Sequence, residues 1–385
     1  MPKLIRITTV PLSLKLLLKH QLRYMAESGY EVLAVASDGK EWADVLRNEK
    51  HIERVIVPFT RKITPLRDLY CLWLLYKLFR QQKPDIVHTH TPKAGLLGML
   101  AAWAAGVPHR VHTLAGMPLV SRKKVQKSLL LFVEKTTYRL AHEVWPNARS
   151  LKEFILREKL TDERKIHLVG NGSSNGVDVD QFNRRNLQEN HLVAATMRIS
   201  PGENEFLFLA VGRLVKDKGI AELVEAFVQS KIVNRSKLVL LGDFEQKLNP
   251  LNRKTMNQIA DHPKIVHVPW SDHVAHYMAL SDVLVHPSHR EGFPNVLLEA
   301  GAMCCPIICS DIAGNLEVVS PMKTALVFPV GQVQALQEAL EYAFVKRARM
   351  QDFAENLYRI VLGGYARKSV HLSMLNAYNR MLNRK

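Results

Sequence analysis

Cysteine is scarce in this chain, with four residues among 385. Three of the four, Cys304, Cys305 and Cys309, lie in one short apolar segment that is typical of a buried strand. Such thiols belong to a reduced hydrophobic core, which argues against a disulfide framework and against a zinc site. The cysteine content therefore indicates a reducing compartment, and we expect the cytoplasm.

Long hydrophobic runs are absent as well. A membrane-spanning helix needs about 20 consecutive apolar residues, and Lys, Arg or Gly interrupts the apolar stretches before that length. Lys15, Lys19 and Arg23 break up the leucine-rich N-terminal segment, and no small-residue cleavage site is evident, so we expect no signal peptide. Hydrophobic residues make up 47% of the chain, which predicts a folded soluble protein, and the length of 385 residues favours two domains.

Acidic residues are in deficit, with 36 Asp and Glu against 53 Lys and Arg, for a net charge of +17. The imbalance is concentrated in residues 1–150, which hold 24 of the basic residues but only 11 of the acidic ones. Such a charge favours an anionic partner: nucleic acid, a phosphorylated substrate or an acidic membrane surface. We do not expect nucleic acid, because the chain lacks a helix-turn-helix signature, zinc fingers and a recognisable RNA-binding module.

Apolar segments of strand length alternate with longer helical segments along the chain. In the first half we expect strands at residues 4–9, 31–37, 54–57, 85–90, 109–113 and 143–146. In the second half we expect strands at residues 206–211, 237–241, 265–268, 283–286 and 306–309. Helices are expected between and after them, for example at 12–28 and 333–349. This alternation predicts an α/β fold whose parallel sheets are covered by helices on both faces.

Turn-forming residues at 170–178 and a polar stretch after them separate the two alternations. We place the interdomain connection between about 180 and 202. The prediction is one domain at 1–190, a second at 191–365, and a C-terminal helix at 366–385 that packs back on the first. Two doubly wound, Rossmann-like domains of this kind would face each other across a cleft at the carboxyl ends of their sheets.

Glu291 and Glu299 flank a transition from loop to helix after the strand at 283–286. The free N–H groups and the positive dipole end of a helix N-terminus favour an anion such as a phosphate. The backbone that would surround this anion runs through Gly292, Phe293, Pro294, Asn295 and Val296. Two glutamates at this spacing are more often a solvated pair on a helix surface, so the pair alone does not establish a site.

Arg213 and Lys218 form a second constellation, in a loop that follows the strand at 206–211 and is bounded by Gly212 and Gly219. A forked guanidinium and a point-charge ammonium suit one diphosphate. The plain alternative is a pair of solvated surface cations. The loop follows a buried strand at the predicted cleft edge, which favours a ligand-binding role.

Together, the Arg213–Lys218 loop and the Glu291–Glu299 segment resemble the retaining glycosyltransferases of family four, which have the GT-B architecture. Four motifs of the first half are similar to those of the CapM-type capsular and exopolysaccharide glycosyltransferases: TTVPLSLK at 8–15, HTHTPKAG at 88–95, HTLAG at 112–116 and NGSSNGVD at 171–178. The match runs in order along nearly the whole chain, which makes it far more specific than any single motif.

By this resemblance, the first domain would bind the acceptor and the second would bind the donor, a nucleoside diphosphate sugar. Arg213 and Lys218 would bind the diphosphate together with the backbone of 292–296, and Glu299 would take the ribose hydroxyls. Glu291 would contact the donor sugar or lie near the anomeric centre.

The resemblance implies two further roles: the nucleobase would pack beside Gly242, and His112 would close the reaction centre from the first domain. His88 and His90 alternate on a strand end and are weaker candidates, without a third ligand for a metal. We expect no metal cofactor, because the Asp-x-Asp motif at 178–180 belongs to a turn-rich, structural segment. Fixed cations and helix-end amides would stabilise the departing diphosphate instead. The implied chemistry is front-side attack, in which the departing phosphate helps to deprotonate the acceptor hydroxyl.

The sequence therefore predicts a retaining hexosyltransferase. Its donor would carry UDP, with an N-acetylhexosamine or a uronic acid derivative among the sugars considered, and its acceptor would be a saccharide on a polyprenyl diphosphate lipid. The product would belong to a capsule, an O-antigen or an exopolysaccharide. The alternatives are a nucleotide-sugar epimerase or hydrolase of the same architecture, which would need no acceptor, and, more remotely, a basic nucleic-acid-binding protein.

Two basic clusters precede apolar runs in the first half, at 61–67 before 70–76 and at 121–127 before 129–133. Cations beside exposed apolar side chains suit an anionic bilayer surface, whereas an ordinary amphipathic helix would bury the same leucines in the core. The charge of the first half favours the bilayer. We therefore expect a cytoplasmic protein that associates peripherally with the inner face of the cytoplasmic membrane.

Overall fold

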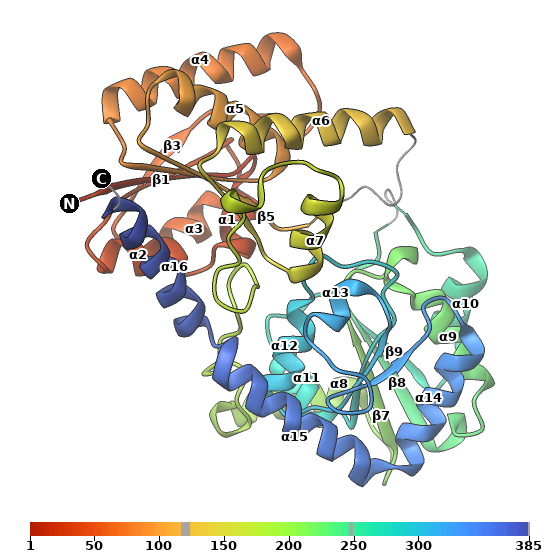
Figure 1. Cartoon of the computed structure of the whole chain (residues 1–385). Helices are drawn as coiled ribbons and strands as arrows, with labels where there is room; N and C mark the ends of the chain where they lie inside the picture. Colours follow the sequence, from red (N-terminus) through yellow and green to blue (C-terminus); the bar gives the residue numbers. More distant parts are fainter. Residues whose placement is uncertain (117–123, 246–248, 384–385) are drawn as a thin grey trace. The chain divides into compact units, whose positions relative to one another are not determined.

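The computed structural model describes residues 1–116, 124–245 and 249–383 (Figure 1). The chain divides into two compact units. The first unit contains Met1–Asn175 and Lys368–Lys385, and the second contains Gly176–Arg367. Each unit is built on a six-stranded sheet whose strands all run parallel, so the predicted α/β class is confirmed.

The division between the units lies after Asn175, earlier in the chain than the sequence suggested with a boundary at 190. The reason is that the segment after Asn175 already pairs and packs with the second unit. Val177 forms a bridge with Ala366, and Phe182 is buried in the second unit's core. Helix α8 (Glu189–Ile199) also lies in this polar segment, where only a connection was expected.

The sheet of the first unit has the strand order β3-β2-β1-β4-β5-β6. The strands are β1 (Lys3–Ile7), β2 (Glu31–Ala36), β3 (Ile52–Ile56), β4 (Ile86–His90), β5 (His109–Leu114) and β6 (Glu143–Pro146). The strand order reverses between β1 and β4, and in open parallel sheets the carboxyl ends at such a switch point are where ligands bind. The TTVP motif directly follows β1, and the HTHTPKAG motif overlaps the end of β4. Because β1 and β4 are neighbours, the fold brings both motifs to this switch point.

Two layers of helices cover the first sheet (Figure 1). One layer contains α4 (Pro65–Gln82), α5 (Pro92–Ala104) and α6 (Lys124–Leu140), with α5 packed between the other two. The opposite layer includes α1 (Pro11–Leu17), α2 (Gln21–Glu27), α3 (Trp42–Asn48) and α16 (Arg367–Leu382). Helix α7 (Arg149–Arg157) follows β6.

The single helix predicted at 12–28 is wrong, because the structure divides it into α1 and α2. His20 has a left-handed backbone with φ of 67°, which ends the regular helix before α2. The carboxylate of Glu49 accepts hydrogen bonds from the backbone N–H groups of His20 and Arg23, at the start of α2. A tertiary contact from a distant residue thus stabilises a break that local apolar periodicity does not reveal.

A buried arginine joins four elements of the first unit. Arg6 of β1 is 0% exposed and donates hydrogen bonds to Gln21 Oε1 of α2 at 2.8 Å and to Tyr378 Oη of α16 at 2.9 Å. Its Nη2 also lies 3.0 Å from His90 Nε2 of β4, and Tyr378 Oη lies 2.5 Å from His88 Nδ1. Burial lowers the pKa of Arg6, and these neutral acceptors satisfy its N–H groups.

The sheet of the second unit has the order β12-β11-β10-β7-β8-β9. The strands are β7 (Phe206–Val211), β8 (Ser236–Leu241), β9 (Ile265–Val268), β10 (Val283–His286), β11 (Ile307–Ser310) and β12 (Leu326–Phe328). Here the strand order reverses between β7 and β10. The loops that carry Arg213, Lys218 and Glu291 leave the sheet at this switch point, where a ligand is expected.

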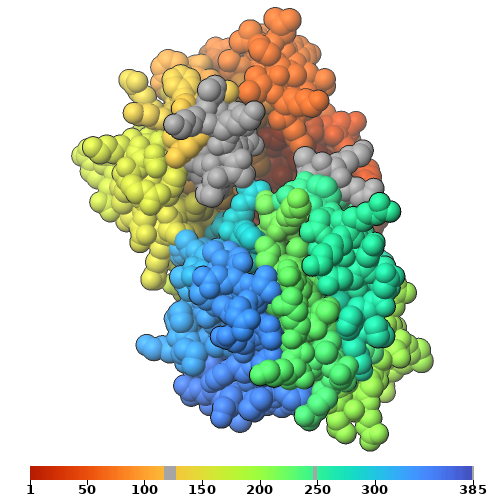
Figure 2. Space-filling model, turned by 90° about the vertical axis from the view of Figure 1, so that its right-hand side faces the viewer, coloured from red at the N-terminus to blue at the C-terminus, as the bar shows by residue number. Residues whose placement is uncertain are grey.

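Two hydrophobic cores lie on opposite faces of the second sheet. Alternate residues of β7 divide between them, with Leu207 and Leu209 in one and Phe206 and Phe208 in the other. The first core also includes residues of α8, α11 (Val274–Leu280), α12 (Asn295–Ala302) and α15 (Arg347–Gly364). The second includes residues of α9 (Ile220–Gln229), α10 (Arg253–Asp261) and α14 (Val333–Val345). Helices α9 and α14 are neighbours, and Figure 2 shows them as adjoining green and blue surfaces.

Two details of the remaining helices of the second unit differ from what the sequence suggested or were not expected from it. A short α13 (Ala313–Leu316) follows β11. The helix predicted at 333–349 ends at Val345, and α15 begins at Arg347. Within the described residues, no helix has the length and apolar character that crossing a membrane requires.

We predict that Tyr378→Phe destabilises the first unit by about 1–3 kcal/mol, because it leaves a buried N–H group of Arg6 and the buried Nδ1 of His88 without their shared partner. Urea denaturation followed by circular dichroism measures this loss. Tyr358→Phe, at a tyrosine on the exposed side of α15, is the matched control and should change stability little. Equal stability of the two variants would contradict the role assigned to the Arg6 contacts.

Candidate active site

Backbone-to-backbone packing at two glycines builds the site in the second unit. Gly242, after β8, has φ of 144°, and an added Cβ would lie 2.0 Å from the carbonyl oxygen of Gly212. Gly219, which ends the Arg213–Lys218 loop, has φ of 67°, and an added Cβ would lie 2.1 Å from the carbonyl oxygen of Pro287. Only glycine allows both approaches. The loops after β7, β8 and β10 are thereby packed against one another.

Glu291 is held by three side chains from two loops and a strand end. The Lys218 ammonium forms an ion pair with Glu291 Oε1, and Ser288 Oγ donates a hydrogen bond to the same oxygen at 2.8 Å. His286 Nε2, at the end of β10, lies 3.2 Å from it. Burial by itself would raise the pKa of Glu291, but the contact with His286 and the charge of Lys218 outweigh burial and lower the pKa to about 2. Glu291 is therefore ionised at neutral pH and serves as a hydrogen-bond acceptor, not as a proton donor.

Arg213 has a different partner from Lys218. Its side chain is 62% exposed, and its guanidinium pairs with the carboxylate of Glu245, in the loop after β8. The structure thus brings the two predicted cations to the same end of the sheet but engages each with its own carboxylate. A diphosphate that binds both cations would replace two carboxylates with phosphate oxygens.

The N-terminus of α12 contributes backbone donors to the same region. The helix begins at Asn295 after Pro294, and the N-cap residue makes no side-chain hydrogen bond to the first turn. The first-turn N–H groups of such a helix favour an anion. Glu299 lies one turn further along α12 and is half-buried. Gly292 and Phe293 form the loop before the helix, and Phe293 packs beside the Tyr365 ring at a centroid distance of 5.9 Å.

Sequence reasoning missed the residues that support Gly242. His267 of β9 lies with Nε2 2.9 Å from the Gly242 carbonyl oxygen, and its ring packs against Phe244 at a centroid distance of 4.5 Å. The backbone N–H of Trp270 donates a hydrogen bond to Asp243 Oδ1 at 3.0 Å. An aromatic residue two or three positions after a predicted strand, as at Phe244 and Trp270, was the available signal in the sequence. Glu245, His286 and Ser288 were also missed, because their contacts join residues from separate loops.

His112 of the first unit is 1% exposed. Its Nδ1 lies 2.8 Å from Thr89 Oγ1 of β4, and its Nε2 lies 3.9 Å from Glu134 Oε2 of α6. Burial lowers the pKa of His112 to about 3, so the ring is neutral. Gly95 permits this packing, since an added Cβ there would lie 2.6 Å from His112 Cε1. His112 contacts groups of its own unit, and its contact with a substrate stays a prediction.

The other polar candidates have structural partners. His88 and His90 stack at a centroid distance of 4.3 Å beside Arg6, and burial lowers both of their pKa values well below the usual range. Asp178 pairs with Arg367 at 2.7 Å and accepts hydrogen bonds from the backbone N–H groups of Asp180 and Gln181. These contacts explain the Asp-x-Asp motif as part of a turn.

Comparisons with known proteins agree with this geometry. A family model for glycosyl transferases group 1 matches residues 195–359, and a model for a glycosyl transferase 4-like domain matches residues 18–172. The capsular polysaccharide biosynthesis glycosyltransferase CapM of Staphylococcus aureus is 31% identical over 385 residues, which cover 99% of this chain and 97% of the relative. The chain belongs to glycosyltransferase family 4. It is a retaining glycosyltransferase, and the resemblance expected from its motifs is confirmed.

Other relatives of this family-4 enzyme extend the comparison. A UDP-Gal:alpha-D-GlcNAc-diphosphoundecaprenol alpha-1,3-galactosyltransferase of Escherichia coli is 34% identical over 269 residues, which cover 66% of this chain and 65% of the relative. The crystal structure of a glycosyltransferase from Rickettsia africae has a TM-score of 0.84 at 19% identity, covering 100% of this chain and 99% of that one. This likeness confirms the GT-B fold, with a Rossmann-like domain in each unit.

We predict a distinctive pH dependence of stability from Glu134, whose pKa burial raises to about 7. Between pH 4.5 and 7 the folded protein holds a proton that the unfolded chain releases, so the free energy of unfolding falls as pH rises through this window. Glu134→Gln should remove roughly 3 kcal/mol of this fall. Urea denaturation at a series of pH values measures it. Glu153→Gln, at an exposed position of α7, is the control, and a parallel pH profile for both variants would contradict the prediction.

Proposed function

We propose that this enzyme transfers a sugar from a UDP-sugar to a saccharide carried on a polyprenyl diphosphate lipid, in the synthesis of a surface polysaccharide. The observation that carries the proposal is the cluster at the carboxyl ends of β7 and β10. There, Arg213, Lys218 and the N-terminus of α12 supply positive charge and backbone donors beside an ionised Glu291. The names of two relatives support the rest, since one acts in capsule synthesis and the other uses UDP-Gal and a diphosphoundecaprenol acceptor.

The donor diphosphate is the group that this cluster fits. Arg213 and Lys218 contact its oxygens, and the amides of the 292–296 segment complete the phosphate site. Glu299 accepts hydrogen bonds from the ribose hydroxyls, and the base packs beside Gly242. Glu291 accepts a hydrogen bond from a hydroxyl of the donor sugar, a role that its ionised state suits.

The proposed chemistry proceeds on one face of the anomeric carbon. The acceptor hydroxyl oxygen bonds to that carbon as the bond to the diphosphate breaks, and the leaving phosphate takes both the electron pair and the hydroxyl proton. Arg213 and Lys218 stabilise the charge that develops on the diphosphate, which is where preorganised cations lower the barrier most. His112, buried and neutral, is proposed as a hydrogen-bonding contact at the reaction centre. The residues that carry the reaction are thus His112, Arg213, Lys218 and Glu291.

A peripheral position on the inner face of the cytoplasmic membrane is part of the proposal. A polyprenyl diphosphate acceptor is confined to a bilayer, so the enzyme must work at the bilayer surface. The excess of basic over acidic residues in the first 150 residues supports attraction to anionic lipids.

We predict that Arg213→Ala and Lys218→Ala each lower turnover by about 100-fold or more, because each removes a fixed cation from the leaving group. Lys216→Ala, an exposed cation in the same loop, is the matched control and should keep near-normal turnover. The measurement is release of UDP and formation of glycosylated lipid with a panel of UDP-sugars. Near-normal turnover in both variants would refute the donor site, and UDP release without acceptor would favour an epimerase or hydrolase.

We also predict that Glu245→Gln lowers the donor KM about two- to fivefold with little change in kcat, because Arg213 no longer has to leave a carboxylate to bind phosphate. Steady-state kinetics with the preferred UDP-sugar test this. Glu203→Gln, at an exposed position before β7, serves as the control. A raised KM would instead mean that Glu245 itself contacts the donor.

A further inference from the structure

Helix α4 of the first unit has an apolar outer face. Its inner face is formed by Cys71, Leu75 and Phe79, which are buried. A surface helix normally places charged and polar residues opposite such a stripe. On α4, large apolar side chains occupy the outer face as well, and they are Leu66, Leu69, Tyr70, Trp73 and Tyr76, between 40% and 85% exposed. Exposed apolar patches of this kind mark interaction surfaces.

The exposed residues form one continuous stripe. Positions 66, 69, 70, 73 and 76 recur at intervals of three and four, which places them on one side of a helix. The rings of Tyr70 and Trp73 stack at a centroid distance of 6.0 Å, and Lys77 Nζ lies 5.3 Å from the centroid of the Trp73 ring. Ile63, in the loop before the helix, is 72% exposed and adds another large apolar side chain beside the helix N-terminus.

Cations surround this stripe. Between positions 61 and 83 the chain has six basic residues and one acidic residue, Asp68. All six basic residues are exposed, and they are Arg61, Lys62, Arg67, Lys77, Arg80 and Lys83. The stripe and its cations together are called here the α4 outer face.

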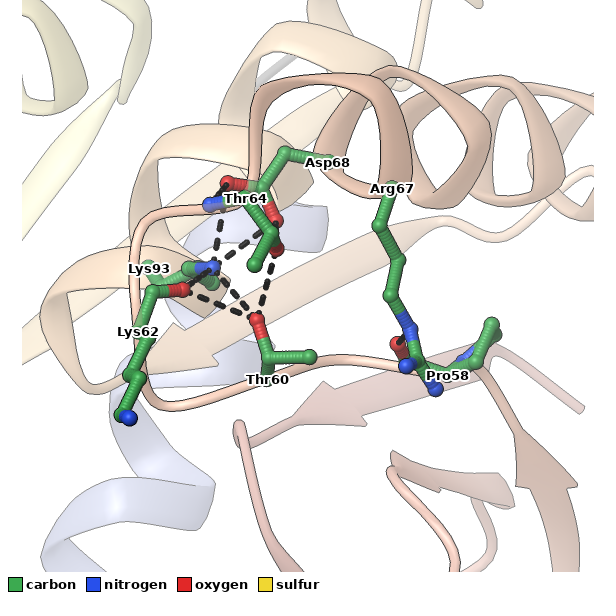
Figure 3. A network of polar contacts seen from close by, with 7 residues as sticks. All are labelled: Pro58, Thr60, Lys62, Thr64, Arg67, Asp68 and Lys93. Carbon is green, nitrogen blue, oxygen red and sulfur yellow. Dashed lines mark hydrogen bonds and ion pairs between the residues drawn. The ribbon is translucent and has the colours of Figure 1, made fainter.

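A network of polar contacts fixes the loop that carries Ile63 (Figure 3). Lys93, in the first turn of α5, donates hydrogen bonds to Thr60 Oγ1 at 3.0 Å, to the Lys62 carbonyl oxygen, and to both carboxylate oxygens of Asp68 at 2.8 and 3.0 Å. Thr64 also donates to Asp68 through its backbone N–H at 3.1 Å. The loop is thereby tied to α5, and the carboxylate of Asp68 is paired on the inner side of the helix start with a lysine outside the α4 outer face.

We propose that the α4 outer face docks on an anionic lipid bilayer, with its apolar stripe in the boundary between headgroups and acyl chains and its cations on lipid phosphates. This inference rests on the membrane position in the proposed function and names the surface responsible. Charge argues against a second copy of the chain as the occupant, because a two-fold contact would place six cations against six. Helix α6 offers a narrower apolar surface, with Leu129 and Phe132 as its exposed large hydrophobic residues among those described.

The test is co-sedimentation of the full chain with vesicles of phosphatidylethanolamine and phosphatidylglycerol, and with vesicles of phosphatidylcholine alone. We expect binding to the anionic vesicles that weakens with salt. Lys77→Gln/Arg80→Gln should reduce the partition coefficient about fivefold for each cation removed. Leu66→Ser/Leu69→Ser should reduce binding in low and in high salt alike, since it removes apolar area and no charge.

Matched variants in the second unit test whether a loss of vesicle binding is specific to α4 or follows from removing any two cations or any two apolar side chains. Arg253→Gln/Lys254→Gln removes two exposed cations of α10, and Val345→Ser/Ile360→Ser removes two exposed apolar side chains. Both should bind vesicles as the unmodified protein does. Equal losses in these controls, or no vesicle binding by the unmodified protein, would overturn the proposal. So would an α4 variant that converts a dimer into a monomer and leaves vesicle binding unchanged, because the face would then be a protein interface.

Transfer to a detergent-dispersed acceptor distinguishes this inference from the proposed function. The α4 variants should keep normal turnover in detergent and lose it with acceptor in anionic vesicles. Vesicle binding through α4 without any transfer of sugar would refute the proposed function alone. Normal transfer by a protein that does not bind vesicles would refute the inference and the membrane position, and would leave the proposed sugar transfer intact.

Discussion

Close packing of backbone on backbone at Gly219 and Gly242 is the constraint on which the proposed donor site depends. At both positions an added Cβ would lie about 2 Å from a carbonyl oxygen of a neighbouring loop. The loops after β7, β8 and β10 come from distant parts of the sequence, and these contacts hold them together at the point where the strand order reverses. Lys218 can pair with Glu291 only because its loop is packed against the end of β10.

Each cation of the site forms an ion pair with a carboxylate. Lys218 neutralises Glu291, and Glu245 neutralises Arg213. The two pairs differ in their surroundings, because Glu291 is also in contact with His286 and Ser288 whereas Arg213 is mostly exposed. An exposed ion pair contributes little to stability and exchanges readily. Arg213 is therefore the more exposed of the two cations, and Lys218 with Glu291 forms the less exposed part of the site.

In the first unit, buried histidines at the strand ends contrast with basic residues at the surface. Burial keeps His88, His90 and His112 uncharged, and neutral groups satisfy the fully buried Arg6. Apart from Arg6, the basic residues whose burial the structure describes in this unit are at least partly exposed, and six of them surround the exposed aromatic stripe of α4. The same unit thus separates a hydrogen-bonded interior at the strand ends from a surface suited to lipid.

The α/β class, the family and the loops proposed to bind the donor could be predicted from the chain alone. Alternating apolar periods distinguish strands from helices locally, and the motifs at Arg213, Lys218 and Glu291 follow recognisable strands. Three features are visible only in the folded protein: His112 is buried, Glu245 pairs with Arg213 from 32 positions away, and Glu49 stabilises a break at His20. Pairings of this kind depend on which loops the sheet brings together. The exposure of the α4 stripe is also visible only in the folded protein. Both faces of this helix are apolar, and an apolar pattern does not tell which of two such faces the core will bury.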